Sequence, residues 1–465
     1  MKKNLVYNFI YQIIAVITPL LLSPYISRVL GASNVGIYSY VDTIIYIFIL
    51  FCMLGINNYG NREISKKRYN QEEKNLFFSE IFLLRIILVF LVLLVFLFFY
   101  IFLIHRYQII FLIQSFMLLN CIIDCNWFFY GLEEFKKITI RNIVCKLVFL
   151  FSVFLFVKSE KDLINYVILN VAVNIVGNLL MIPDIIKNIK FTKIKFKSIF
   201  KHLKPLFILF IPVLSLSLYR QIDKIMIINY FGETNEGYYE FADKVIHVLL
   251  MTLTAISTIL MPRMTTLMNQ NKIKEANEVF LSCFKLNCIV SFAFSFGLAA
   301  VSRQFAPLYF GESYIITGDI LFVLSFSIIF TSLSNIIRAG LMIPKNLDVL
   351  YIVLIIFCLI INVILNIILM KHIGVLGAAL STLIAEMILC ILHILCIKNY
   401  ISNKTLFKIF FKYLLIGSLM FFVVSLINVN SSPWINLLVK IFVGVIVYCF
   451  FILISYLRQK GKKYE

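Results

Sequence analysis

The sequence contains few charged residues and lacks a nucleotide-binding motif. Only 14% of its 465 residues are charged, and 62% are apolar. A soluble globular protein has about 25% charged and about 45–50% apolar residues, so a soluble enzyme, a disordered chain and a fibrous repeat are excluded. No Gly-Lys-Ser/Thr phosphate-binding loop occurs in the chain. We therefore expect no ATP-driven step and no cofactor.

Metal ligands and paired cysteines are also scarce outside the apolar runs. The ten cysteines fall mostly inside those runs, where cysteine packs as a small hydrophobic residue. Cys121 and Cys125 share a helix face near Asp124, but the five histidines are scattered along the chain. We expect neither a disulfide framework nor a metal site.

Long apolar runs make up most of the chain. A helix that crosses a bilayer needs roughly 20 apolar residues, and mean hydropathy is +0.96. We predict an all-α polytopic membrane protein with about fourteen transmembrane helices. The predicted spans are 9–30, 36–57, 78–104, 108–130, 139–157, 163–186, 206–230, 237–262, 281–301, 319–343, 349–370, 374–397, 413–428 and 434–456.

The net charge of +20 is concentrated in the short segments between these runs. With the N-terminus inside, about 30 of the 43 Lys and Arg residues fall in cytoplasmic tails, loops and their edges. The positive-inside rule then places both termini in the cytoplasm. This pattern favours membrane lipids over nucleic acid as the partner of the basic residues. The main basic residues are Lys2, Lys3, Arg62, Lys66, Lys67, Arg68, Lys74, Lys136, Lys137, Arg141, Lys146, the lysines between 187 and 204, Arg458, Lys460, Lys462 and Lys463.

An internal repeat occurs at an offset of 201 residues. The matched positions are Gly31/Gly232, Asn34/Asn235, Gly36/Gly237, Tyr38/Tyr239 and Asp42/Asp243, and Arg62 meets Arg263 at the same offset. The two copies lie six spans apart, so they share one orientation in the membrane. We predict two parallel six-helix lobes, residues 1–200 and 201–400, and a C-terminal helix pair in residues 401–465.

Residues 31–36 of the first copy predict a turn between two helices. A glycine at this point permits the positive φ of a tight reversal. We expect Asn34 to cap the helix that follows the turn.

The residues around this repeat resemble a known family. The run from Pro24 to Tyr40 and the second-copy runs 223–227, 237–244 and 261–263 are similar to polysaccharide repeat-unit flippases of the Wzx type, and Gly374-Val-Leu-Gly377 also fits. These proteins form the polysaccharide transport branch of the multidrug/oligosaccharidyl-lipid/polysaccharide (MOP) exporter superfamily. The similarity extends from about residue 5 to about residue 400.

The resemblance implies a function at the bacterial cytoplasmic membrane. It implies outward flipping of an undecaprenyl-diphosphate-linked oligosaccharide through a cationic cavity between the lobes, for the synthesis of O antigen, capsule or exopolysaccharide. It also implies membrane lipids, a polysaccharide polymerase and a chain-length regulator as partners.

Ionisable residues inside the spans are the candidate site residues, because a charge in the bilayer is costly and usually faces a cavity or a partner. We assign substrate binding to basic residues, since a guanidinium donates two parallel hydrogen bonds to a phosphate. Acidic residues are candidates for ion coupling or structural pairing, and Glu240–Lys244 and Arg220–Asp223 have helical spacing for mutual neutralisation. The substrate-binding candidates are Arg85, Arg220, Lys224, Lys244 and Arg338. The acidic candidates are Asp42, Asp124, Asp223, Glu240, Asp243 and Glu386. Glu80 and Lys440 are expected to extend toward water from the span ends.

Two related functions remain open on the sequence alone. A cation-coupled multidrug exporter of the same superfamily would share the two lobes, but a basic cavity suits cationic drugs poorly. A peptidoglycan-precursor flippase is compatible with the same charges. A membrane glycosyltransferase or polymerase needs catalytic carboxylates or a large loop, and no loop here exceeds about 20 residues. We therefore expect no enzymatic activity.

Overall fold

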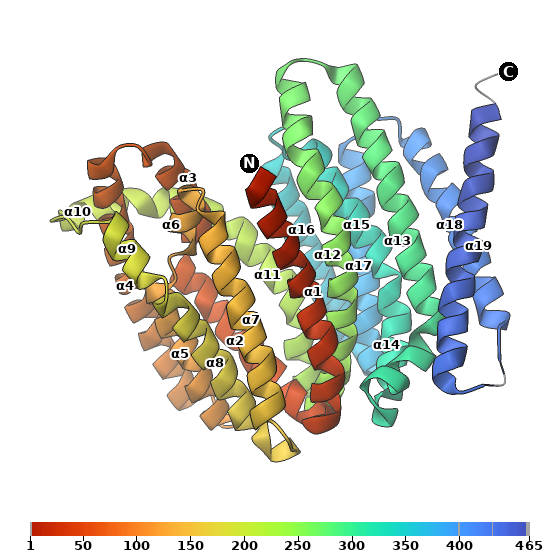
Figure 1. Cartoon of the computed structure of the whole chain (residues 1–465), viewed down its shortest axis with the longest axis horizontal. Coiled ribbons are helices and arrows are strands. Elements are labelled where there is room, and N and C mark those ends of the chain that lie inside the picture. Colours follow the sequence, from red (N-terminus) through yellow and green to blue (C-terminus); the bar gives the residue numbers. More distant parts are fainter. Residues whose placement is uncertain (1, 399, 430, 462–465) are drawn as a thin grey trace. The chain divides into compact units, whose positions relative to one another are not determined.

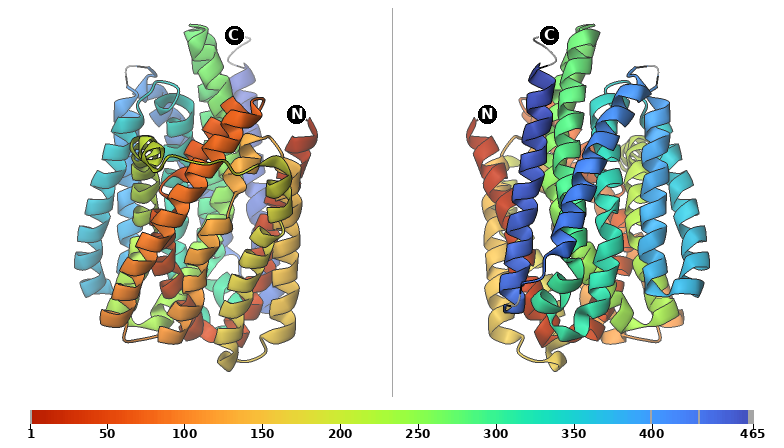
Figure 2. Two further views of the ribbon diagram at one scale, coloured as in Figure 1. Left: turned by 90° about the vertical axis from the view of Figure 1, so that its left-hand side faces the viewer. Right: turned by 90° about the vertical axis from the view of Figure 1, so that its right-hand side faces the viewer.

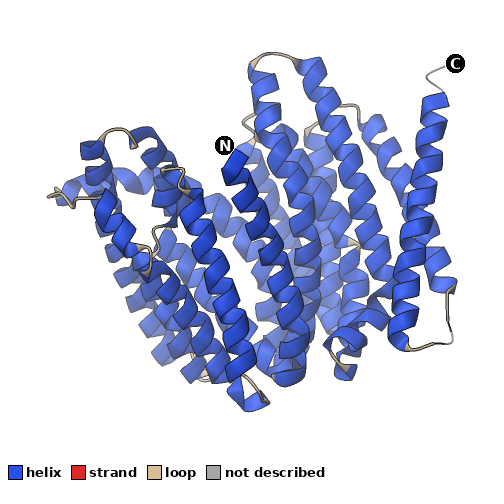
Figure 3. Cartoon of the chain, in the orientation of Figure 1, coloured by secondary structure: helices blue, strands red, loops and turns tan. Residues whose placement is uncertain are grey.

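The computed structural model describes the backbone of residues 2–398, 400–429 and 431–461. Side chains are described for residue 14, for 16–455 apart from 399 and 430, and for residue 457. Within these ranges the regular structure is helical, without a strand (Figure 3), which confirms the predicted all-α class. The basic residues predicted at the two ends, Lys2 and Lys3 and those from Arg458 onward, have side chains outside the described residues.

Thirteen helical segments of the described chain are long and apolar enough to cross a membrane. The N-terminal helix α1 (Lys2–Val29) contains a shorter apolar stretch, Val16–Val29, and with it the helical elements at the positions of the predicted spans number fourteen. Each predicted span coincides with one of these fourteen elements. The structure therefore confirms a polytopic membrane protein.

The chain divides into two compact units, Met1–Gly237 and Tyr238–Glu465. In Figure 1 the first unit runs from red to yellow-green along the sequence. Its elements are α1, α2 (Gly31–Met53), α3 (Ile56–Lys67), α4 (Gln71–Phe102), α5 (Gln108–Ile123), α6 (Asn126–Gly131), α7 (Phe135–Phe156), η1 (Glu160–Asp162), α8 (Leu163–Leu179), α9 (Ile182–Asn188), α10 (Phe196–Ile199), η2 (Phe200–His202) and α11 (Leu203–Phe231).

Five helices of the first unit pack as a ring, in which each helix contacts the next and the last contacts the first. Helix α7 lies between α1 and α8, α8 packs on α5, and α2 packs against α1, α4, α5 and α11. Figure 2 (left) shows α4 and α5 beside each other. An aromatic cluster that includes Phe78, Trp127 and Phe128 fills the end of the unit where α3, α4 and α6 meet. This packing surrounds the polar site described below.

The second unit begins within α12 (Glu233–Asn269). Its remaining elements are α13 (Ile273–Phe310), η3 (Glu312–Tyr314), α14 (Ile315–Ser325), α15 (Ser327–Ile337), the π-helical turn η4 (Arg338–Met342), α16 (Asp348–Ile373), α17 (Val375–Cys396), α18 (Asn403–Leu426) and α19 (Pro433–Gly461). Helix α13 is central, because it contacts α14, α15, α18 and α19. Figure 2 (right) shows α18 and α19 beside α13.

Several helices extend beyond the predicted spans. Helix α12 has 37 residues and α13 has 38, so each is about 55 Å long, whereas the hydrocarbon core of a bilayer is about 30 Å thick. Helix α18 begins at Asn403, ten residues before the start of the predicted span. Its first part carries Lys404, Lys408 and Lys412, so this part is helical although it is too polar to be predicted as a span. Hydropathy predicts the part of a helix that lies in lipid. The backbone hydrogen bonds of the helix continue beyond that apolar part.

The predicted turn at residues 31–36 is shorter than expected. Gly31 has φ +77°, as the turn requires, but α2 begins at Gly31 and its N-cap residue is Leu30. The prediction that Asn34 caps this helix is therefore wrong. Asn34 lies in the first turn of α2 and donates through Nδ2 to the carbonyls of Leu30 (2.9 Å) and Glu160 (2.8 Å).

The second copy of the repeat has the same local geometry. Gly232 has φ +81°, and Asn235 Nδ2 donates to the carbonyl of Phe231 at 2.9 Å. These bonds match those of Gly31, Asn34 and Leu30, 201 residues earlier. The repeated glycine and asparagine therefore build the same helix start twice.

Two further repeated glycines allow α2 to cross closely over the first turn of α12, within residues 1–237. A Cβ at Gly36 would overlap the carbonyl oxygen of Glu233, and a Cβ at Gly237 would overlap that of Ala32. Since Ala32 corresponds to Glu233 and Gly36 to Gly237, the contact is reciprocal. Small residues permit such a close backbone approach between membrane helices.

We expect Gly36→Ala to lower the free energy of unfolding by about 1–3 kcal/mol, the usual cost of forcing a methyl group into filled space. The measurement is thermal unfolding of the purified protein in detergent. Gly297→Ala in α13 is the matched control, because the nearest atom to its added Cβ is Met420 Cε at 3.8 Å. Equal melting temperatures for the two variants would disprove the close crossing.

Candidate functional site

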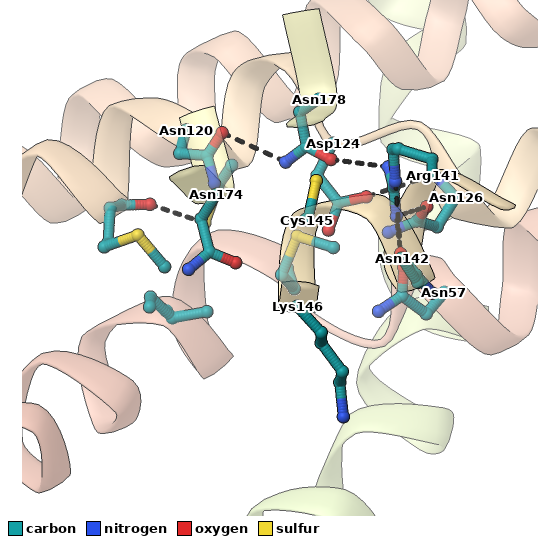
Figure 4. A pocket seen from close by; sticks show the side chains of 14 residues that line it. Asn57, Asn120, Asp124, Asn126, Arg141, Asn142, Cys145, Lys146, Asn174 and Asn178 are labelled. Carbon is teal, nitrogen blue, oxygen red and sulfur yellow. Dashed lines mark hydrogen bonds between the residues drawn. The ribbon is translucent and has the colours of Figure 1, made fainter. Parts of the chain in front are cut away.

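A polar cavity of about 370 Å³ lies inside the first unit (Figure 4). Its walls come from α2, α3, α5, α6, α7 and α8. An apolar helix carries such groups at a cost unless they are hydrogen-bonded or serve a ligand. The polar lining consists of Asn57, Asn120, Asp124, Asn126, Arg141, Asn142, Lys146, Asn174 and Asn178.

Arg141 on α7 organises one wall of this cavity. Its Nη1 donates to Asn178 Oδ1 at 2.8 Å, and its Nη2 donates to Asn126 Oδ1 at 2.8 Å. Both Nη2 and Nε donate to Asn142 Oδ1, at 2.6 and 3.1 Å. Asn178 Nδ2 in turn donates to Asn120 Oδ1 at 3.0 Å. The network joins α5, α6, α7 and α8 through side chains alone.

The break between α5 and α6 places Asp124 at the cavity. Asp124 has extended backbone geometry at the C-terminal end of α5. Its Oδ1 accepts from the backbone N–H of Asn126 at 3.1 Å. Arg85 on α4 lies behind the break, and its Nη1 donates to the carbonyls of Asp124 and, at 3.3 Å, Cys121. The structure thus brings two predicted site residues together through the backbone of one of them.

The position of Arg85 differs from the sequence-based expectation. Its side chain is 0% exposed, and its guanidinium carbon lies 5.6 Å from the centre of the Trp127 ring. It donates to carbonyls that the end of α5 leaves without helical partners. In this structure Arg85 stabilises the helix break and does not present its charge at a cavity surface.

Four other predicted residues of the first unit lie on two packed helices. Asp42 on α2 and Arg220 on α11 are exposed, whereas Asp223 and Lys224 on α11 are buried. A hydrogen bond of 3.2 Å from Thr43 Oγ1 to Gln221 Oε1 joins the two helices at this level. These four residues are not part of the asparagine-lined cavity.

Two side-chain pairs form in the second unit, and the first of them is the predicted Glu240–Lys244 pair. Lys244 Nζ lies 3.0 Å from Glu240 Oε1, and His247 Nε2 lies 3.4 Å from Asp243 Oδ1. Both pairs join residues four apart on α12. The helical spacing therefore correctly predicted the Glu240–Lys244 contact, which lowers the cost of placing charge there.

Arg338 and Glu386 lie elsewhere in the second unit. Arg338 starts the π-helical turn η4, and such turns are frequent at functional sites. Its guanidinium carbon lies 5.3 Å from the centre of the Tyr351 ring, and its buried Nε has no hydrogen-bond partner among the described residues. Glu386 on α17 is buried.

The sequence analysis did not predict the asparagines that line the cavity. It also assigned Arg141 and Lys146, two lining residues, to the basic loops and their edges. Arg141 and Lys146 lie within α7 and line the cavity. Asn170, Asn174 and Asn178 recur every four residues along the largely apolar helix α8. That spacing aligns three amides on one helix face, a signal that a search restricted to charged residues overlooks.

A second buried polar cluster corrects the expectation for Glu80. Instead of reaching water, Glu80 on α4 is 2% exposed. Its carboxylate accepts from Lys201 Nζ (2.8 Å) and contacts His202 Nε2 (2.9 Å). The other ring nitrogen of His202 lies 2.8 Å from the Tyr59 hydroxyl. The cluster ties α3 and α4 to the segment that leads into α11.

Comparison with known sequences identifies the family. Residues 1–268 match the family described as "Polysaccharide biosynthesis protein", which is more than half of the chain. The chain belongs to this family. This confirms the resemblance drawn from the repeat residues.

Individual relatives of this chain are distant in sequence. The chain is 23% identical over 412 residues to a protein of Escherichia coli (strain K12) named "Putative O-antigen transporter", which covers 87% of this chain and 98% of that protein. It is 24% identical over 240 residues to "Probable low-salt glycan biosynthesis flippase Agl15" of Haloferax volcanii, covering 50% of this chain and 49% of that protein.

Solved structures show the same fold. The lipid II flippase MurJ in its inward closed conformation superposes with a TM-score of 0.78 at 18% identity, over 99% of this chain and 100% of MurJ. An outward-facing multidrug resistance transporter of the MATE family, in the MOP superfamily, gives a TM-score of 0.59 at 15% identity, over 88% and 97% of the two chains. This member of the polysaccharide biosynthesis family therefore has the MOP transporter fold.

Proposed function

We propose that this protein is a flippase for lipid-linked oligosaccharides. It moves an undecaprenyl-diphosphate-linked repeat unit outward across the bacterial cytoplasmic membrane, for synthesis of O antigen, capsule or exopolysaccharide. The observation that carries the proposal is the polar, asparagine-lined cavity among apolar membrane helices. Sugars and a diphosphate need such a lining, because about 30 Å of hydrocarbon would otherwise strip them of water.

An apolar groove in the second unit supports a lipid-linked substrate. It has a volume of about 420 Å³ and lies between α12, α13, α18 and α19, with Gly297, Val301, Met420 and Gly444 among its lining residues. Lys440 is half-buried at the same groove. A groove of this kind accepts a hydrocarbon chain while a polar headgroup moves elsewhere.

Basic residues of the membrane helices are proposed to contact the diphosphate during transport. A basic group at the bilayer centre costs at least about 2.5–3.5 kcal/mol, and an acidic neighbour, water in a cavity or a diphosphate offsets this cost. Among the predicted residues, Arg220, Lys224, Lys244 and Arg338 keep this role in the proposal. Arg85 does not, because its side chain is fully buried and its Nη1 donates to backbone carbonyls inside the protein.

The acidic residues are proposed to have two different roles. Glu240 neutralises Lys244 and Asp243 contacts His247 on the same helix, and Asp124 stabilises the helix break. Asp42, Asp223 and Glu386 remain proposed residues for ion coupling or pairing. No cofactor or metal is part of this mechanism.

The charges of the loops support one orientation of the protein in the membrane. We propose that both termini are cytoplasmic, since the basic loops then lie inside. A polysaccharide polymerase and a chain-length regulator are the proposed protein partners, because they act on the flipped product.

Flipping of a peptidoglycan precursor is the second candidate function, favoured by the full-length fold similarity to MurJ.

Flipping in proteoliposomes that contain only this protein tests the proposal. We expect Lys224→Gln and Arg338→Gln to lower the rate of flipping of a fluorescent lipid-linked oligosaccharide by at least about tenfold, which corresponds to about 1.4 kcal/mol. Arg338→Lys restores part of the rate, because the charge returns without the planar guanidinium fork.

Arg303→Gln is the control, since the Arg303 side chain is 72% exposed and paired with Asp319. Normal flipping by Lys224→Gln and Arg338→Gln at normal protein levels would refute the cationic pathway. Preference for a peptidoglycan precursor over the oligosaccharide would instead select the second candidate.

A further inference from the structure

We propose that the asparagine-lined cavity of the first unit binds an oxyanion carried by the substrate, either a carboxylate on an acidic sugar or a phosphate of the carrier. This inference rests on the proposed flippase function and specifies the chemistry that the cavity recognises. It uses residues that are separate from the basic residues of the proposed transport pathway.

The orientation of the amides follows from Arg141. A guanidinium only donates hydrogen bonds, so Asn126, Asn142 and Asn178 must each turn the carbonyl oxygen toward it. All three Oδ1 atoms accept from Arg141 at 2.6–2.8 Å. The NH₂ groups of these side chains consequently point away from Arg141.

Asn178 transmits this orientation to the next amide. Because its carbonyl is held by Arg141, its NH₂ group donates to Asn120 Oδ1 at 3.0 Å. Asn120 therefore also turns its NH₂ group away from the network. Arg141 thus fixes four amides and leaves the NH₂ groups of Asn120, Asn126 and Asn142 as available donors.

The charges of the lining favour an anion. Arg141 and Lys146 are basic and both line the cavity, and in Figure 4 the Lys146 side chain runs from α7 along the side away from the asparagines. Asp124 is the acidic residue of the lining, and its Oδ1 accepts from the backbone N–H of Asn126. The buried guanidinium of Arg85 adds positive charge behind this carboxylate. The charges of the groups at the cavity therefore sum to a positive value.

A lining that is rich in donors discriminates between ligands. Sugar hydroxyls both donate and accept hydrogen bonds, whereas carboxylate and phosphate oxygens accept only. A purely structural network would fill its space, but here a volume of about 370 Å³ stays open, which is within the range of small-molecule sites, about 300–1,000 Å³. The site therefore matches an oxyanion with sugar hydroxyls beside it.

Binding to the full-length protein in nanodiscs tests the inference with three probes. Methyl glucuronide and methyl glucoside differ in a carboxylate, and inorganic pyrophosphate represents the carrier. We expect the glucuronide or pyrophosphate to bind at least about tenfold more tightly than the glucoside, as measured by titration calorimetry. Binding of the glucuronide assigns the oxyanion to the glycan, and binding of pyrophosphate alone assigns it to the lipid carrier.

Two variants connect the binding to the cavity. Lys146→Gln removes a charge, and Asn142→Asp replaces an NH₂ donor by an acceptor while keeping the bond to Arg141. Each is expected to weaken oxyanion binding at least about tenfold, equivalent to about 1.4 kcal/mol. Lys187→Gln on α9, an exposed residue outside the cavity, serves as the matched control and leaves binding unchanged.

Equal binding of glucoside and glucuronide without pyrophosphate binding, or oxyanion binding unaffected by both variants, would overturn the inference. The flipping assay separates this failure from failure of the proposed function. Wild-type flipping without oxyanion binding refutes the inference alone. Absence of flipping by the wild-type protein refutes the function.

Discussion

Arg85→Ala is expected to destabilise the first unit by about 3 kcal/mol or more and to prevent normal accumulation of the protein. The substitution leaves the space of a fully buried side chain and removes the donor that serves the carbonyls of Cys121 and Asp124. A large cavity costs about 2–5 kcal/mol, and each buried acceptor without a donor adds about 1–3 kcal/mol. Protein yield and thermal unfolding in detergent measure the effect.

Arg85→Lys should recover part of this stability, because an ammonium group supplies a donor for one of the carbonyls. The matched control is Arg303→Ala, since Arg303 is exposed and its ion pair with Asp319 at 2.7 Å contributes at most about 1 kcal/mol. If Arg85→Ala unfolds like the wild type but no longer flips substrate, Arg85 contacts substrate and the helix-break role is refuted.

Glu80→Ala is expected to lower the free energy of unfolding by about 1–3 kcal/mol, because it leaves the buried His202 ring without its hydrogen-bond partner. Glu80 accepts from Lys201 and contacts His202, which in turn contacts Tyr59. Loss of the carboxylate thus loosens the junction of α3, α4 and α11. The change in melting temperature of the purified protein measures this loss.

A double-mutant cycle isolates the interaction between Glu80 and His202. The combined loss in Glu80→Ala/His202→Ala should be smaller than the sum of the single losses, since the two side chains share one contact. Glu133→Ala is the matched control, because Glu133 is 62% exposed in its pair with Arg68. Additive losses would show that Glu80 and His202 do not stabilise each other.

Hydropathy alone located every spanning segment, because the cost of placing polar groups in hydrocarbon depends on local composition. It did not locate helix ends. Helix α12 continues to Asn269 and α18 begins at Asn403, since backbone hydrogen bonding does not stop at the membrane surface. Charge and hydropathy carry no information on how far a helix extends into water.

The repeat was equally visible in the sequence, since glycine and asparagine are rare in apolar runs and their recurrence after 201 residues is specific. Gly31 and Gly232 have the positive φ that the repeat predicted. The close crossing at Gly36 and Gly237 was not visible, because it depends on which backbone lies opposite each glycine.

The sequence by itself determined the membrane class, the number of spans, the repeat, the family resemblance and ion pairs between residues four apart on a helix. These properties depend on composition or on fixed helical spacing. Only the tertiary structure decided that Arg85 faces carbonyls and that Arg141 orients the amides of Asn126, Asn142 and Asn178. Most of their partners lie 15 to 39 residues away in the sequence, and Asn142 is adjacent to Arg141. Helical spacing reveals neither kind of contact. The role of a buried polar group depends on the atoms that packing places around it.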